Sequence, residues 1–203
     1  MLRHRNPRFV CRAAGGPDLR DREHTSVIDH EVTPALDAGA LADLRSQWGD
    51  LPALIGFYER FGSLRLYRDS VTRHDIGRAS AYYIASPDTW AGLHESVVDW
   101  LGDIDEEERA EFVPDWLDGC IAIGQIPNSG NTFLVPVTGT DRGKVFEFEH
   151  DGLEFIERAD TFEAFVEQLA TVDEARLRDI GSHTRSSDGQ TPLQWMPVSY
   201  LHD

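Results

Sequence analysis

The clearest structural signal in the chain lies in residues 120–156, which read CIAIGQIPNSGNTFLVPVTGTDRGKVFEFEHDGLEFI. Four short apolar runs alternate here with turn-forming residues, and His150-Asp151-Gly152 separates the last two runs. An Asp-Gly pair between alternating runs is a strong signal for a β-hairpin. Short connections between consecutive strands make those strands antiparallel neighbours. With the shorter runs at 64–68 and 81–84, the pattern predicts a mostly antiparallel meander of about four to six strands.

Helical patterns flank this stretch on both sides. Three segments before it place apolar side chains three and four residues apart, as one face of a helix does: residues 34–48, 52–61 and 86–101. After the strands, Asp160 and Glu163 form the spacing of a capping box that begins a further helix. The sequence therefore predicts an α+β fold in which helices pack around the sheet.

Composition limits the kind of protein. The 203 residues fit one domain with appendages, and 36 acidic residues against 19 basic ones give a formal charge of -17. This charge argues against binding nucleic acid or an anionic membrane, because both need clusters of Lys and Arg. No apolar run approaches the roughly 18 residues of a membrane-spanning helix. Cys11 and Cys120 cannot form a disulfide scaffold, so we expect a cytoplasmic protein.

The two ends of the chain differ from its centre. Residues 1–24 carry six arginines against three acids and few apolar side chains, so we expect a disordered Arg-rich arm over residues 1–30. Residues 31–181 then form the α+β domain. The tail over 182–203 is polar at first, but its last ten residues are apolar enough that we expect them to dock on the domain.

No motif assigns a catalytic, cofactor or metal site. The turn from Gly139 to Lys144 resembles a phosphate loop, but Val145 stands where Ser or Thr would bind magnesium. Cys120 opens an apolar strand and is expected to be a small buried residue. The eight histidines show no spacing typical of a metal site. We therefore predict no catalytic residue, no cofactor and no metal.

The acidic residues gather in one segment. Residues 99–118 hold nine acids and one base, Arg109, and the aromatic residues Trp100, Phe112 and Trp116 interleave with them. Acids around aromatic anchors suit a surface that binds a cationic protein. A solvated face in a proteome that is acidic throughout remains the alternative, and Trp116 is equally suited to the core. The candidate partner-binding residues are Asp103, Asp105, Glu106, Glu107, Glu108, Glu111, Asp115, Trp116 and Asp118.

The order of these motifs resembles a known family. The residues that carry the likeness are Leu51-Pro52, Phe57-Tyr58, Phe61-Gly62, Trp116, 121–124, 129–131, 133–135, 143–146, His150-Asp151 and 161–166. This pattern is similar to that of the SUKH superfamily, which joins fungal cell-wall-assembly regulators to bacterial immunity proteins. The resemblance covers roughly residues 50–170, and the family has no catalytic residues to transfer.

The resemblance implies a protein-binding function. In bacteria, such proteins typically neutralise a cognate polymorphic toxin, often one that targets nucleic acid with a basic cleft. We therefore expect a non-enzymatic immunity protein whose acidic surface occludes a basic toxin domain. Two alternatives stay open: a regulatory or scaffold module of the SUKH type without a toxin partner, and an enzyme with an unrecognised site.

Overall fold

The computed structural model describes residues 8–13, 24–69, 80–105, 107, 109, 112–127, 129–173, 175–176 and 193–197. Its strands are β1 (Arg8–Ala13), β2 (His24–Val32), β3 (Leu64–Asp69), β4 (Tyr82–Ile84), β5 (Cys120–Gln125), β6 (Thr132–Pro136), β7 (Val145–Glu149), β8 (Glu154–Ala159) and β9 (Leu193–Pro197). Its α-helices are α1 (Ala38–Trp48), α2 (Pro52–Tyr58), α3 (Trp90–Trp100) and α5 (Phe162–Ala170). Short 3-10 turns are η1 (Pro87–Thr89), η2 (Leu101–Asp103) and η3 (Leu117–Gly119).

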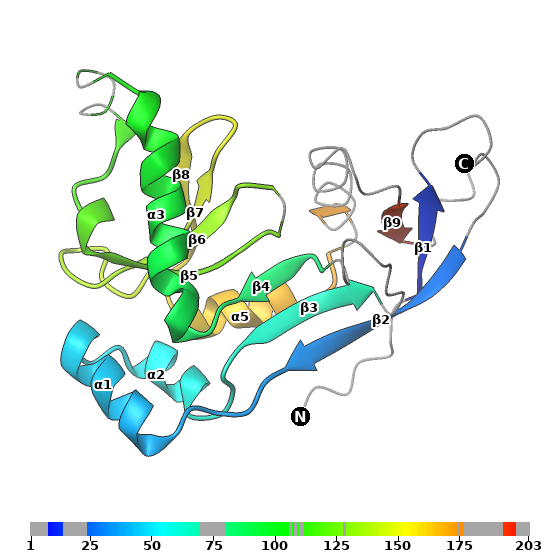
Figure 1. The fold of residues 1–203 in the computed structure, drawn as a ribbon, viewed down its shortest axis with the longest axis horizontal. Helices are drawn as coiled ribbons and strands as arrows, with labels where there is room; N and C mark the ends of the chain where they lie inside the picture. Colours follow the sequence, from blue (N-terminus) through cyan, green and yellow to red (C-terminus); the bar gives the residue numbers. More distant parts are fainter. Residues whose placement is uncertain are drawn as a thin grey trace.

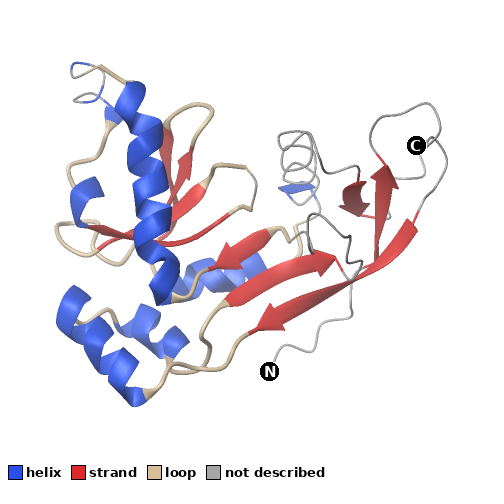
Figure 2. Cartoon of the chain, in the orientation of Figure 1, coloured by secondary structure: helices blue, strands red, loops and turns tan. Residues whose placement is uncertain are grey.

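The strands form one open antiparallel sheet (Figure 1). Within the described residues its nine strands lie in the order β8-β7-β6-β5-β4-β3-β2-β1-β9, so β1 to β8 follow the chain without a crossover. Figure 2 shows the helices arranged around this sheet. The α+β class and the antiparallel meander predicted from the sequence are confirmed. The sheet is larger than the expected four to six strands, because β1, β2 and β9 extend it beyond β3.

The first thirty residues differ from the expected disordered arm. Strand β1 lies within this segment, and most of β2 does as well. Strand β2 pairs with β3 over Ile28–Val32, and β1 pairs with both β2 and β9. Backbone hydrogen bonds to the edge of an existing sheet need no apolar pattern, so composition alone does not reveal such strands. The C-terminal tail contributes β9 to the far end of the sheet.

Both faces of the sheet are buried at β5, β6 and β7. Alternate residues of β5, β6 and β7 enter two separate clusters, as the neighbours Ile121 and Ala122 illustrate. The larger cluster joins one face to α1, α2 and α5, and the smaller one packs the other face against Val97 of α3 and the segment after it. Strand residues that point in opposite directions therefore both meet a covering layer.

Helix boundaries follow local capping. Asp37 Oδ1 accepts a hydrogen bond of 2.9 Å from the backbone N–H of Ala40, so α1 begins at Ala38 and not at residue 34. Helix α5 is capped by Thr161, whose Oγ1 accepts from the N–H of Ala164 at 3.1 Å. The predicted cap at Asp160 was wrong by one residue. Among the described residues, no helix has the length and apolar composition needed to cross a bilayer.

Candidate functional site

The acidic segment forms the connection between α3 and β5, and we call residues 101–119 the acidic connection. Buried Leu101 anchors its beginning and buried Leu117 its end, both in the smaller core cluster. Between them, the backbone N–H of Arg109 donates to Asp105 O at 2.8 Å, and that of Val113 donates to Arg109 O at 3.0 Å. The two anchors fix both ends of the connection on the domain.

The acids predicted to bind a partner divide into two groups. Those with exposed side chains are Asp105, Glu107, Asp115 and Asp118. The side chain of Asp103 and residues Glu106, Glu108 and Glu111 lie outside the described residues. The exposed carboxylates of Glu107, Asp115 and Asp118 face water, and exposed charge of this kind is the requirement for electrostatic steering.

Trp116 does not protrude into solvent, as a residue that anchors a partner protein would. Its side chain is half-buried, and its ring centroid lies 4.7 Å from that of Phe146 and 5.7 Å from that of Phe155. These contacts place it against the smaller core cluster. The structure thus favours the alternative that Trp116 belongs to the core, and its partner-binding role remains a prediction.

Two other aromatic residues of this region are exposed. The side chain of Trp100 is 50% exposed and that of Phe112 is 57% exposed. Both residues interleave with the acids in the sequence, but among the aromatic residues only Trp116 is predicted to bind a partner. Trp100 follows Val97 at helical spacing, which predicts that Trp100 joins the buried stripe of α3. The structure instead buries Val97 and Leu101 and leaves Trp100 half-exposed beside His150. Exposed aromatic side chains among carboxylates have the composition of a protein-binding surface.

The turn between β7 and β8 lies beside this surface. The rings of Trp100 and His150 have centroids 4.9 Å apart. Gly130, with φ of 85°, lies against the same imidazole, and a Cβ at this position would be 2.7 Å from the His150 ring. Only glycine gives this close approach together with a positive φ. The aromatic end of α3 and the loop before β6 therefore both contact the β7–β8 turn.

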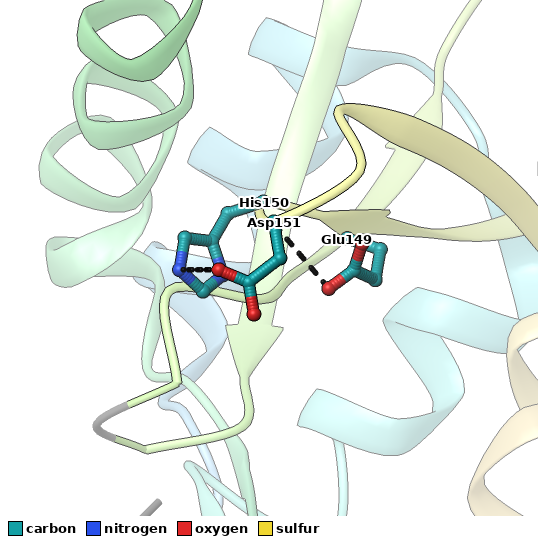
Figure 3. Close-up of side chains that lie close together, drawn as sticks. All are labelled: Glu149, His150 and Asp151. Atoms are coloured by element: carbon teal, nitrogen blue, oxygen red, sulfur yellow. Dashed lines mark hydrogen bonds and ion pairs between the residues drawn. The ribbon is translucent and has the colours of Figure 1, made fainter. Parts of the chain in front are cut away.

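The same turn gathers three possible metal ligands (Figure 3). Ligand atoms of Glu149, His150 and Asp151 lie within 4.8 Å of one another. However, the carboxylate of Glu149 accepts hydrogen bonds from the backbone N–H groups of Asp151 and Gly152, at 3.3 and 2.7 Å. His150 Nε2 lies 3.1 Å from Asp151 Oδ1. These side chains stabilise their own turn, and this arrangement assigns no cofactor.

Glu147 is a buried charge. The sequence alternation in residues 145–149, with Phe146 and Phe148 turned inward, predicts instead that Glu147 and Glu149 lie on the outer face of the sheet, and for Glu147 that prediction is wrong. Its side chain is 3% exposed. One carboxylate oxygen accepts from Asn131 Nδ2 at 2.9 Å, and the other accepts from Arg158 Nε at 2.8 Å and Arg176 Nη2 at 2.7 Å. The expectation for Glu147 failed because the face opposite Phe146 and Phe148 is covered as well.

Cys120 has the buried position that the sequence predicts. It belongs to the smaller core cluster, and burial raises the pKa of its thiol to about 12. Nearby Asp118 acts in the same direction, because a negative charge disfavours the thiolate. A thiol that stays protonated near neutral pH is a poor nucleophile.

Comparison with known proteins gives no family assignment. No protein-family model matches the chain, and no curated protein is similar to it in sequence. The surface itself carries the functional evidence: Phe112 and the exposed carboxylates lie on the acidic connection, and Trp100 lies beside it at the end of α3. Such a surface can attract a cationic protein and provide apolar contacts once the protein has arrived.

Proposed function

We propose that the protein is a non-enzymatic, cytoplasmic immunity protein of the SUKH type, which neutralises a basic, nucleic-acid-targeting toxin domain. The observation that carries the proposal is the joint exposure of Trp100 and Phe112 among the exposed acids of the acidic connection. A toxin that grips nucleic acid needs a basic cleft, and an anionic protein surface competes for that cleft.

The proposal assigns separate roles to charges and rings. Carboxylates such as Glu107 and Asp115 act at a distance, so they raise the rate of encounter with a cationic toxin. Aromatic side chains act at contact, because they bury large apolar areas and slow dissociation. A net charge of -17 extends the attraction beyond the connection itself.

The direct test is a binding measurement between the full chain and the toxin domain encoded next to it. We expect a stable complex at low salt, and we expect the double variant Glu107→Lys/Asp115→Lys to bind at least tenfold more weakly. The matched control is Glu163→Lys/Glu167→Lys, which changes the net charge equally through exposed acids of α5. We expect the control to lose much less affinity, because salt screens exposed charges that lie far from the contact with the toxin.

Two results would contradict the proposal. Absence of a complex with the neighbouring toxin at low salt would remove its basis. Equal loss of affinity in the two double variants would show that net charge alone is responsible and would move the interface away from the acidic connection. A stable complex with a partner that has no toxic activity would instead support the alternative of a regulatory or scaffold module.

A further inference from the structure

A groove lies next to the acidic connection. It has a volume of about 620 Å³ and opens between α1, the first half of α3 and β5. Its walls are mainly apolar: Leu36, Leu44 and Trp48 contribute from α1 and the residue stretch before it, and Ala91 and Ile121 contribute from the opposite side. Cavities of about 300–1,000 Å³ with apolar walls and a few polar groups are typical binding sites.

The rim of the groove carries three aspartates beside the polar Gln47 and His94. Asp43 from α1, Asp88 from η1 and Asp118 from η3 line it with exposed side chains, and no Lys or Arg is among the lining residues. None of the three carboxylates makes a hydrogen bond or ion pair with another residue that the structure describes. The rim therefore carries three negative charges that no described cation neutralises.

The absence of Lys and Arg from its lining distinguishes the groove from two other hollows of the domain. A hollow of about 360 Å³ beside α5 is lined by Arg158 and Arg176 together with Asp173. A smaller one of about 180 Å³ contains Arg142 and Asp160. In both, acidic side chains have cationic neighbours. The uncompensated charge of the groove is thus a local property, beyond the general excess of acids in the chain.

Two further ionisable side chains, His94 and Cys120, line the groove. His94 Nε2 forms a 3.0 Å hydrogen bond with the backbone O of Leu117, so the ring is held against the beginning of η3. Cys120 is buried in the adjoining core. A ligand complementary to the groove must place apolar side chains against its walls and a cation beside its acidic rim.

We propose that the groove binds a basic amphipathic segment of the partner protein, with apolar side chains on the walls and Lys or Arg beside Asp88 and Asp118. The inference rests on the proposed function and adds the chemistry of the segment that is recognised. Asp118 belongs to both the groove rim and the acidic connection, so the two surfaces are continuous. A helix laid in an apolar groove with flanking charges is an established mode of peptide recognition.

The test uses the full chain and a synthetic peptide of Leu and Arg, with leucines at positions i, i+3, i+4 and i+7 of a helix. In a ¹⁵N-labelled titration, we expect chemical-shift changes at Ala40, Ala91 and His94, which line the groove. The double variant Asp88→Lys/Asp118→Lys should weaken binding about tenfold. Its matched control is Glu95→Lys/Asp99→Lys, with the same change in charge on exposed positions of α3 outside the groove.

A second variant tests the walls without altering charge. Ala91 is exposed on α3, so Ala91→Trp is expected to fold normally while its indole fills the groove and abolishes the groove shifts. Shifts that map elsewhere, unchanged binding by Ala91→Trp, or equal weakening by the two double variants would each overturn the groove proposal. The toxin-binding test depends on Glu107 and Asp115, so a toxin that binds equally well to Asp88→Lys/Asp118→Lys would overturn the groove alone. If the native chain does not bind the toxin at all, that result contradicts the proposed function instead.

Discussion

Asn131 Nδ2 donates a 2.9 Å hydrogen bond to Glu147 Oε1, which links the loop before β6 to the middle of β7. The Oδ1 atom of the same amide accepts from the backbone N–H of His150 at 3.3 Å. One side chain therefore connects a buried carboxylate to the turn that contacts Trp100. The interior charge and the exposed aromatic end of α3 belong to one hydrogen-bonded and packed network.

Removal of the buried carboxylate should destabilise the domain. Glu147→Ala leaves Arg158 and Arg176 without their shared acceptor and Asn131 Nδ2 without its partner. We expect the free energy of unfolding to fall by about 3 kcal/mol, near the lower limit for a broken buried ion pair because both arginines retain some contact with water. Urea unfolding measures this change. The exposed control Glu163→Ala should alter stability by less than about 0.5 kcal/mol, and equal effects would disprove the role of Glu147.

Two glycine substitutions should have opposite effects on stability. A Cβ at Gly124 would overlap the carbonyl oxygen of Tyr83 where β4 and β5 pair, so Gly124→Ala must displace backbone and should prevent stable folding. Gly92 lies within α3, and a Cβ there meets nothing within 4 Å. Gly92→Ala should raise the free energy of unfolding by about 0.5–1 kcal/mol. Thermal melts followed by circular dichroism test both, and a stable Gly124→Ala variant would contradict the close strand approach.

Stability should fall in alkaline solution partly through Tyr82. Burial raises the pKa of its phenol from 10.0 to about 12, although the positive charge of Arg176 acts in the opposite direction. Because the pKa is raised in the folded state, the contribution of the Tyr82 phenol to the free energy of unfolding is complete below pH 10. This contribution is lost as pH rises toward 12. Between pH 9 and 11, we expect the native chain to lose about 1 kcal/mol more than Tyr82→Phe. Denaturant titrations at both pH values test this. Equal losses of stability in the native chain and in Tyr82→Phe would contradict it.

Charged and aromatic residues should affect different rate constants for toxin binding. Glu107→Lys is expected to slow association and reduce its salt dependence, because exposed charges act mainly by steering. Phe112→Ala should speed dissociation at least tenfold while changing association little. Val172, an apolar residue that is 41% exposed, offers the matched control Val172→Ala. Surface plasmon resonance resolves both constants, and identical dissociation rates for the two truncations would remove Phe112 from the interface.

The sequence predicts β5 through β8 well because their signals are local, although it does not predict β1, β2 and β9. The apolar runs from Cys120 to Ile156 and the intervening turns correspond to β5 through β8, since alternation and turn chemistry both act over a few residues. The helix after them was also expected, but its cap is Thr161 and not Asp160, because both residues have suitable side chains and only backbone geometry selects one.

Burial across the sheet could not be predicted in the same way. Alternation in β7 separates Glu147 from its two phenylalanine neighbours, but it does not reveal that a second layer covers the face with the charge. Trp116 and Trp100 show the same limit for the candidate site. The exposure of each depends on how its segment packs on the sheet, with Trp116 against Phe146 and Trp100 beside His150. This packing is a tertiary property that spacing along the chain does not contain.

The sequential strand order bears on how a growing polypeptide acquires this structure. From β1 to β8, each strand pairs with the next one synthesised; the links within β5–β8 are short, whereas α1 and α2 lie between β2 and β3, and α3 lies between β4 and β5. Strand β9 pairs instead with β1, across most of the chain. Sequential pairs can therefore form as the chain is synthesised, whereas the pairing of β1 with β9 waits until Leu193–Pro197 has been made.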